Sequence, residues 1–131
     1  MDASRLVSVP LFADLSRKDL KAVAQHADEV QLTEGSKIVE QGRLAYELFV
    51  IQNGTADVLL DGEVIARLGP GDVVGEIGVL QTHFRTATVV ATSPVDAIVM
   101  YGQELTALTR TLPGVLAELE RLIAERTRGS G

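Results

Sequence analysis

One short stretch of this 131-residue chain combines the residue types that bind a charged sugar. The segment Gly71–Leu80 holds three glycines and the carboxylate of Glu76, and Arg85 follows nine positions after that carboxylate, beside the hydroxyl of Thr86. Glycine lets a backbone approach a ligand closely and adopt positive φ. A guanidinium suits phosphate oxygens, and an ionised carboxylate can only accept hydrogen bonds, for instance from a sugar hydroxyl. The stretch therefore predicts a site for a ribose phosphate.

The backbone of the same stretch is a second source of hydrogen-bond donors. A short helical turn that opens at Gly75 would direct unpaired N–H groups outward, which favours an anion. Two charged side chains, two backbone donors and burial of a base could together reach micromolar affinity, which is about −8 kcal/mol. These features favour a binding site over a catalytic one.

The composition narrows the class of protein. Apolar residues make up 46% of the chain, Cys is absent, only two histidines are present and the formal net charge is −6. The apolar content favours one globular domain. The absence of Cys leaves no disulfide or thiolate metal site, and the two histidines are too few for a metal-binding roll. The acidic balance argues against a nucleic-acid surface. Without a signal peptide or an apolar run long enough to span a membrane, we expect a cytoplasmic protein that contacts no membrane.

The N-terminal part of the chain predicts one amphipathic helix. Ser16 begins a sequence that resembles a capping box, and Leu20, Val23, Ala24 and Ala27 then recur at helical spacing. We therefore expect a helix over about Arg17–Ala27.

From Asp28 the pattern changes to short β-prone runs separated by turns. These runs are Val30–Leu32, Lys37–Glu40, Leu48–Gln52, Ala56–Leu60, Val64–Leu68, Thr86–Thr92 and Val95–Met100. The dipeptides Asp61-Gly62 and Asn53-Gly54 each signal a two-residue hairpin turn. Leu48–Ile51 is apolar throughout, which predicts burial on both faces. Seven or eight short strands predict a sandwich or small barrel.

The last third of the chain predicts two helices. The first covers Gln103–Arg110, and Pro113 can occupy the first turn of the second, which continues to about Arg126. The apolar stripe of the second helix consists of Val115, Leu116, Leu119, Leu122 and Ile123. This stripe is expected to pack against the rest of the protein, and it could also pair with a second chain.

From about Val9 to Arg128, the chain resembles the cyclic-nucleotide-binding domain family. The segment Gly75–Leu80, followed by Arg85–Thr88, is similar to that family's phosphate-binding cassette, and Pro113–Arg126 is similar to its C-terminal lid helix. The resemblance implies a mainly β fold with flanking helices. We expect an eight-stranded antiparallel, jelly-roll-like β-roll with an N-terminal helix, a short cassette helix and two C-terminal helices.

The resemblance also implies roles for the cassette residues. Glu76 would hold the ribose 2′-OH, Arg85 the cyclic phosphate, and Thr86 would add a contact to the phosphate. Backbone N–H groups at Ile77 and Gly78 would complete the cradle. For Glu76 and Arg85, the alternative is an ordinary position on the protein surface. For Thr86, the alternative is a strand residue that is present for its β-propensity.

Three further residues are assigned to the pocket. Gly75 belongs to the cassette motif, and Val58 and Leu68 would line the pocket from the roll, with ordinary core packing as their alternative. Gly78 stands where the family usually has Ala, which is expected to loosen the short helix by about 1 kcal/mol.

We expect one domain over residues 1–131, with an N-terminal helical segment over 1–27, a β-roll over 28–101 that contains the cassette at 71–88, and two helices over 102–128.

The predicted function is binding of a cyclic nucleotide, cAMP in preference to cGMP, by a regulatory module whose last helix moves. The chain is not expected to be an enzyme or to hold a cofactor or metal. The expected partners are the nucleotide, an effector domain or protein, and a second copy through the last helix. The alternative is a ligand-free relative used for protein interaction.

Overall fold

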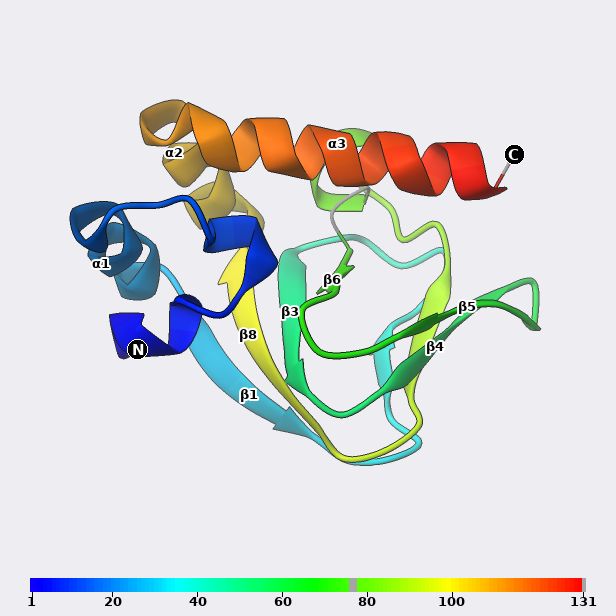
Figure 1. Cartoon of the computed structure of the whole chain (residues 1–131). Coiled ribbons are helices and arrows are strands. Elements are labelled where there is room, and N and C mark those ends of the chain that lie inside the picture. Colours follow the sequence, from blue (N-terminus) through cyan, green and yellow to red (C-terminus); the bar gives the residue numbers. More distant parts are fainter. Residues whose placement is uncertain (76–77, 131) are drawn as a thin grey trace.

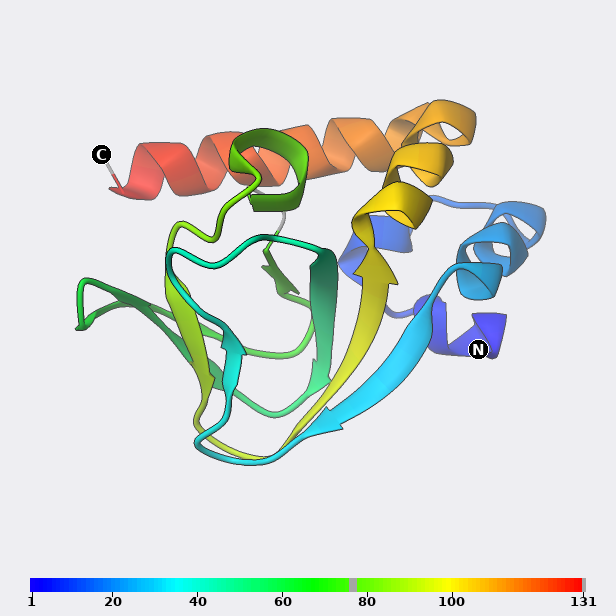
Figure 2. The ribbon, with the colours of Figure 1, turned by 180° about the vertical axis from the view of Figure 1, so that it is seen from behind.

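Two four-stranded antiparallel sheets form the body of the protein, and helices cover one of them (Figures 1 and 2). The structure is a computed structural model that describes residues 1–75 and 78–130, with side chains described except at 80–81 and 126–130. The first sheet has the strand order β1-β8-β3-β6 and the second β2-β7-β4-β5. The strands are β1 (Asp28–Leu32), β2 (Lys37–Val39), β3 (Glu47–Asn53), β4 (Ala56–Leu60), β5 (Glu63–Leu68), β6 (Val73–Val74), β7 (Thr88–Ala91) and β8 (Val95–Tyr101). The predicted eight-stranded roll is confirmed.

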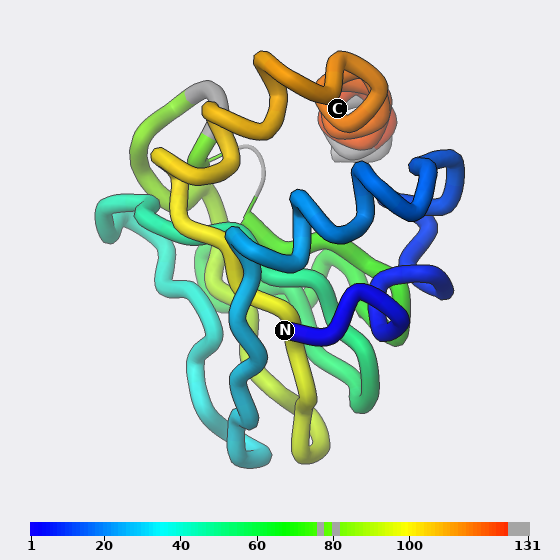
Figure 3. The backbone as a smooth tube through the Cα atoms, turned by 90° about the vertical axis from the view of Figure 1, so that its left-hand side faces the viewer, coloured from blue at the N-terminus to red at the C-terminus, as the bar shows by residue number. Residues whose placement is uncertain are grey.

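Helical segments precede, interrupt and follow the strands. They are the 3₁₀ turns η1 (Ala3–Leu6) and η2 (Pro10–Phe12), helix α1 (Arg17–Gln25), the π-helical turn η3 (Gly78–Thr82), and helices α2 (Gly102–Thr111) and α3 (Pro113–Ser130). Helices α2 and α3 lie at the same end of the roll as η3 in all three views (Figures 1 to 3). The turn η3 begins at Gly78 within the predicted cassette, so the predicted site lies at the helical end of the roll.

Helix α1 begins where the capping pattern predicts. The Ser16 hydroxyl accepts a hydrogen bond from the backbone N–H of Asp19 at 3.2 Å, which satisfies one donor that the first helical turn would otherwise leave unpaired. The apolar face, formed by Leu20, Val23 and Ala24, is buried. The N-terminal helix is therefore confirmed, and it ends two residues earlier than expected.

Strand β3 separates two hydrophobic cores. Leu48 and Val50 pack in a core between the first sheet and the helices, whereas Phe49 and Ile51 pack in a second core between the two sheets. All four side chains are buried. The prediction that this run is buried on both faces is confirmed.

The two turn dipeptides have different outcomes. Asp61 and Gly62 both have positive φ, 51° and 85°, and they join the antiparallel pair β4–β5 as predicted. Asn53-Gly54 does not form the predicted hairpin, because β3 pairs with β6 and β8 while β4 belongs to the other sheet. Gly54 lies where the chain crosses between the sheets, and a Cβ there would collide with the carbonyl oxygen of Pro94. Glycine is needed at this position for its positive φ of 95° and for the close approach, and not for a hairpin turn.

The C-terminal helices pack against the N-terminal segment and the first sheet. Leu105 and Leu108 of α2 share the first core with Val115 and Leu119 of α3. Helix α3 contacts both α2 and η2. The apolar stripe of α3 is therefore largely covered within the chain, as its expected packing role requires.

Candidate functional site

A segment between β2 and β3 holds the backbone of Arg85 in place. The N–H of Arg85 donates to the carbonyl of Arg43 at 2.7 Å, and the carbonyl of Arg85 accepts from the N–H of Gly42 at 3.0 Å. Leu44 and Phe84 form an antiparallel bridge beside these bonds. We call residues 42–46 the strap. Because the strap pairs with the segment that carries Arg85, the position of the arginine is fixed by backbone geometry.

The Arg85 side chain points into the protein. It is 4% exposed, and its guanidinium donates from Nη2 to the carbonyl oxygen of Glu47 at 2.7 Å and from Nη1 to the carbonyl oxygen of Gly75 at 3.3 Å. The carboxylate of Glu47 also accepts from Nη2, at 3.3 Å. A buried guanidinium requires such acceptors, because leaving a charge unpaired in the interior is very unfavourable. The surface reading of Arg85 is therefore wrong.

The glycines of the cassette make room for this arginine. Gly75 has φ +91°, and a Cβ on it would collide with Nη1 of Arg85. A Cβ on Gly78 would lie 2.9 Å from the Cβ of Ala45 in the strap and 3.1 Å from the carbonyl oxygen of Phe84. The strap and the cassette thus approach too closely for alanine at position 78 without a local shift, which gives a structural reason for glycine there.

The other predicted site residues are only partly described. Glu76 and Ile77 lie outside the described residues. Thr86 is exposed and lies before β7, which begins at Thr88, two residues later than predicted. Val58 and Leu68 are half-buried and pack against the core between the sheets. They face the interior of the roll, as a pocket-lining role would need, but core packing accounts for the same contacts.

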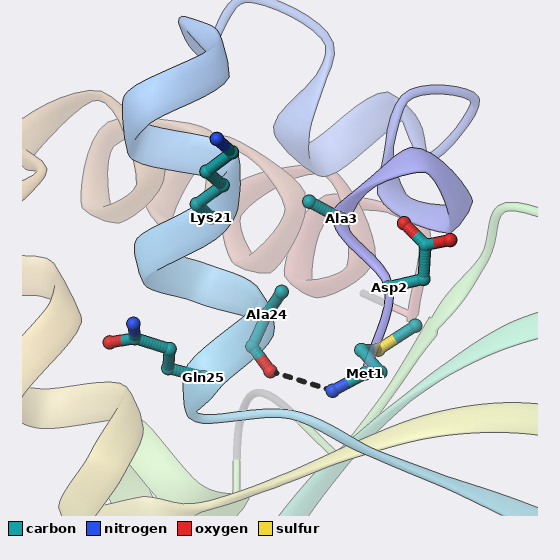
Figure 4. Close-up of a pocket in the computed structure, with 6 residues that line it drawn as sticks. All are labelled: Met1, Asp2, Ala3, Lys21, Ala24 and Gln25. Carbon is teal, nitrogen blue, oxygen red and sulfur yellow. Dashed lines mark hydrogen bonds between the residues drawn. The ribbon is translucent and has the colours of Figure 1, made fainter.

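The hollow drawn in Figure 4 lies apart from this cassette. It has a volume of about 350 Å³ and is formed by the N-terminal segment and α1. Its lining residues are Met1, Asp2, Ala3, Lys21, Ala24 and Gln25, and the Met1 amino group donates to the Ala24 carbonyl at 3.1 Å. No residue predicted for the site lines this hollow.

Among the residues that the structure describes, no group of three or more His, Asp or Glu side chains is close enough together to hold a metal ion. No helix in that part of the chain combines the length and apolarity needed to cross a membrane.

Comparison with known proteins identifies the family. The family model described as the cyclic nucleotide-binding domain matches residues 29–111, which include the strap, the cassette and Arg85. The chain belongs to this family, so the predicted resemblance is confirmed.

Individual relatives agree with that assignment. The cyclic AMP receptor protein of Thermus thermophilus is 29% identical over 124 residues, covering 91% of this chain and 57% of the receptor. The solved structure of the Thermus thermophilus catabolite activator protein is 28% identical, with a TM-score of 0.81 over 92% of this chain and 59% of that one. A regulatory subunit of a cAMP-independent protein kinase A from Trypanosoma cruzi, bound to guanosine, is 26% identical, with a TM-score of 0.79 over 91% of this chain and 43% of that one. The chain spans between 22% and 57% of the lengths of the first curated relatives it matches.

Sequence reasoning missed two contributors to the site. Glu47 holds the guanidinium, and the strap holds the Arg85 backbone. A weak signal for Glu47 was present, because a lone carboxylate at the start of a fully buried strand needs a cationic or donor partner. The strap carries no such signal, since its contacts are made by backbone groups that every residue possesses.

Proposed function

We propose that this chain binds a cyclic nucleotide through its cassette, with Arg85 contacting the cyclic phosphate. The observation that carries the proposal is a buried guanidinium that donates to the carbonyls of Gly75 and Glu47, on a residue whose backbone pairs with the strap. A preformed, water-shielded cation recognises a phosphate with less reorganisation than a flexible surface arginine. The experiment is calorimetric titration of the purified chain with cAMP and, separately, with cGMP. We expect saturable binding with a dissociation constant near the micromolar range; no heat at millimolar nucleotide would reject the proposal.

Within this class we favour cAMP over cGMP. The Thermus thermophilus relative is a cyclic AMP receptor by name. The hydroxyl of Thr86 is exposed beside Arg85 and could also accommodate guanine ligands, so the titration decides between the two bases. A dissociation constant for cGMP equal to or below that for cAMP would overturn this preference.

The second candidate is a roll that has no phosphate ligand. The Trypanosoma cruzi relative that is bound to guanosine supports this candidate, because guanosine carries no phosphate. Arg85 favours a phosphate over a nucleoside, because a nucleoside offers the guanidinium no anionic group to bind. Thermal unfolding discriminates between the two: at a hundredfold excess of cAMP over its dissociation constant, the midpoint should rise by roughly 10 °C. A shift with guanosine alone would favour the nucleoside reading, and no shift with any of these compounds would favour a protein-interaction module.

The proposed role of Glu76 gives a separate prediction. If its carboxylate accepts a hydrogen bond from the ribose 2′-OH, 2′-deoxy-cAMP loses a charge-assisted bond of about 1.5–3 kcal/mol. We expect at least about tenfold weaker binding of the deoxy analogue to the wild-type chain. Competition titration against cAMP measures the ratio, and equal affinity for the two nucleotides would remove Glu76 from this role.

The proposed output is a change in the packing of α3. Its buried residues Val115, Leu119 and Ile123 belong to a helix that packs against α2 and η2. A ligand can shift this packing only if it prefers one arrangement of the helix over the other. We expect amide exchange in α3 to slow by about threefold or more when saturating cAMP is added. If amide exchange slows in the cassette but is unchanged in α3, then α3 does not act as a lid over the ligand.

The proposal makes the chain a binding module whose effect depends on another protein or domain. An effector domain or protein, in the same chain or another, would receive the change in α3. The half-buried Leu116 and Leu122 on the apolar stripe of α3 could also contribute to a homodimer.

A further inference from the structure

The carboxylate of Glu47 is an anionic partner of the Arg85 guanidinium. It lies 3.3 Å from Nη2 of Arg85, and the Glu47 carbonyl oxygen lies 2.7 Å from the same nitrogen. One residue therefore supplies both a neutral and an anionic acceptor to one guanidinium nitrogen. Carboxylates and phosphates are the two anions that the planar guanidinium binds best. The charge of Arg85 is therefore balanced from within the chain.

The two acceptors on Glu47 differ in how freely they can leave. The carbonyl oxygen belongs to β3, which is paired with β8 at Glu47 opposite Tyr101, so it cannot move without disturbing the sheet. The side chain is 28% exposed, whereas that of Arg85 is 4% exposed. The carboxylate thus has access to water and can leave the guanidinium by rotating about its own side-chain bonds. The arginine has less freedom, because its side chain is buried and its guanidinium also donates to the carbonyls of Gly75 and Glu47.

A nucleotide phosphate that reaches Arg85 meets this carboxylate. Two anions that share one partly buried cation repel each other, and the repulsion is stronger at low effective dielectric than in water. The phosphate must either displace the carboxylate or bind against its repulsion.

From this geometry we propose that Glu47 is an internal competitor that lowers the affinity of the site for its nucleotide. The proposal rests on the proposed function and concerns the regulation of the same site. A site whose cation is already paired with a carboxylate responds only at higher concentrations of a phosphate ligand. Before a nucleotide binds, Glu47 orients the Arg85 guanidinium. Once a nucleotide binds, the negative charge of Glu47 repels the phosphate.

The test is the substitution Glu47→Gln, which keeps the shape and an acceptor oxygen but removes the charge. We expect the dissociation constant for cAMP to fall by about threefold to tenfold in calorimetric titration. The matched control is Glu63→Gln, which makes the same charge change at an exposed position on the β4–β5 hairpin and should leave the constant unchanged. Unchanged or weaker binding by Glu47→Gln, with circular dichroism and unfolding midpoint like those of the wild type, would overturn the proposal. Weaker binding would mean that Glu47 orients Arg85 for the ligand.

A ligand-free measurement separates this proposal from the proposed function. A double-mutant cycle with Glu47→Gln and Arg85→Gln, read by urea unfolding, should show about a threefold or larger coupling in the unfolding constant. No coupling would show that the carboxylate does not hold the arginine, which overturns the competitor even if cAMP binds. If the wild-type chain shows the coupling but binds neither nucleotide, the proposed function is rejected. The competitor role of Glu47 is then rejected too, and the Glu47–Arg85 contact is only a structural ion pair.

Discussion

Replacing Arg85 by alanine is expected to weaken cyclic nucleotide binding by at least about a hundredfold. Each charge-assisted hydrogen bond from a guanidinium contributes about 1.5–3 kcal/mol, and the phosphate would lose two of them. The loss is then about 3–6 kcal/mol, or a factor of a hundred to ten thousand. Calorimetric titration of the variant with cAMP measures the change directly.

The same substitution also affects folding, because it leaves the carbonyls of Glu47 and Gly75 without their guanidinium donor. Unfolding should therefore be followed alongside binding, and we expect a destabilisation of about 2–4 kcal/mol. Arg43→Ala is the matched control, because Arg43 lies in the strap with a side chain that is 76% exposed. It removes the same charge from the strap, which pairs with the Arg85 segment, and should change affinity by less than about threefold. Equal affinity losses in the two variants would mean that Arg85 acts only through the net charge of the protein.

Replacing Gly75 by alanine is expected to be much more damaging than the same replacement at Gly62. Both glycines have positive φ, +91° and +85°, so the backbone strain of an alanine is similar at each and amounts to about 1–2 kcal/mol. The surroundings differ, because nothing lies within 4 Å of a Cβ at Gly62 whereas a Cβ at Gly75 collides with the Arg85 guanidinium. The collision should add about 1–3 kcal/mol to the cost at Gly75.

The pair of variants also separates stability from function. Urea unfolding should give a larger loss for Gly75→Ala, and titration should show weaker cAMP binding for that variant alone, because a displaced guanidinium no longer meets the phosphate. Similar losses of stability in the two variants, with affinity preserved at Gly75→Ala, would contradict the contact between Gly75 and Arg85.

Local sequence patterns were sufficient wherever a feature depends on neighbours in the chain. The cap at Ser16, the turn at Asp61-Gly62 and the double burial of Leu48–Ile51 are all of this kind, and all three were correctly predicted. Each rests on spacing or on the conformational preference of one or two residues. The family was recognised because the types and spacing of the cassette residues are specific.

Features that depend on contacts between distant segments were not predictable in the same way. The Asn53-Gly54 turn has the composition of a hairpin, yet its strands belong to different sheets because longer-range pairing with β8 and β7 prevails. The two-residue strand β6 is too short to produce a periodic pattern, and it forms because it pairs with β3. The contact of Glu47 with Arg85 joins residues 38 positions apart, and no local signal specifies that partner.

The central claim is that the nucleotide phosphate binds at Arg85, and a crystal structure of the chain with cAMP tests it most directly. The account predicts phosphate oxygens within about 3 Å of the Arg85 guanidinium, with the ribose against the cassette. The Glu47 carboxylate should have moved away from Nη2, while the carbonyl of Glu47 keeps its place in β3. A nucleotide that lies elsewhere, for example in the hollow beside Lys21, with Arg85 still bound to the Glu47 carboxylate and to Gly75, would contradict the account.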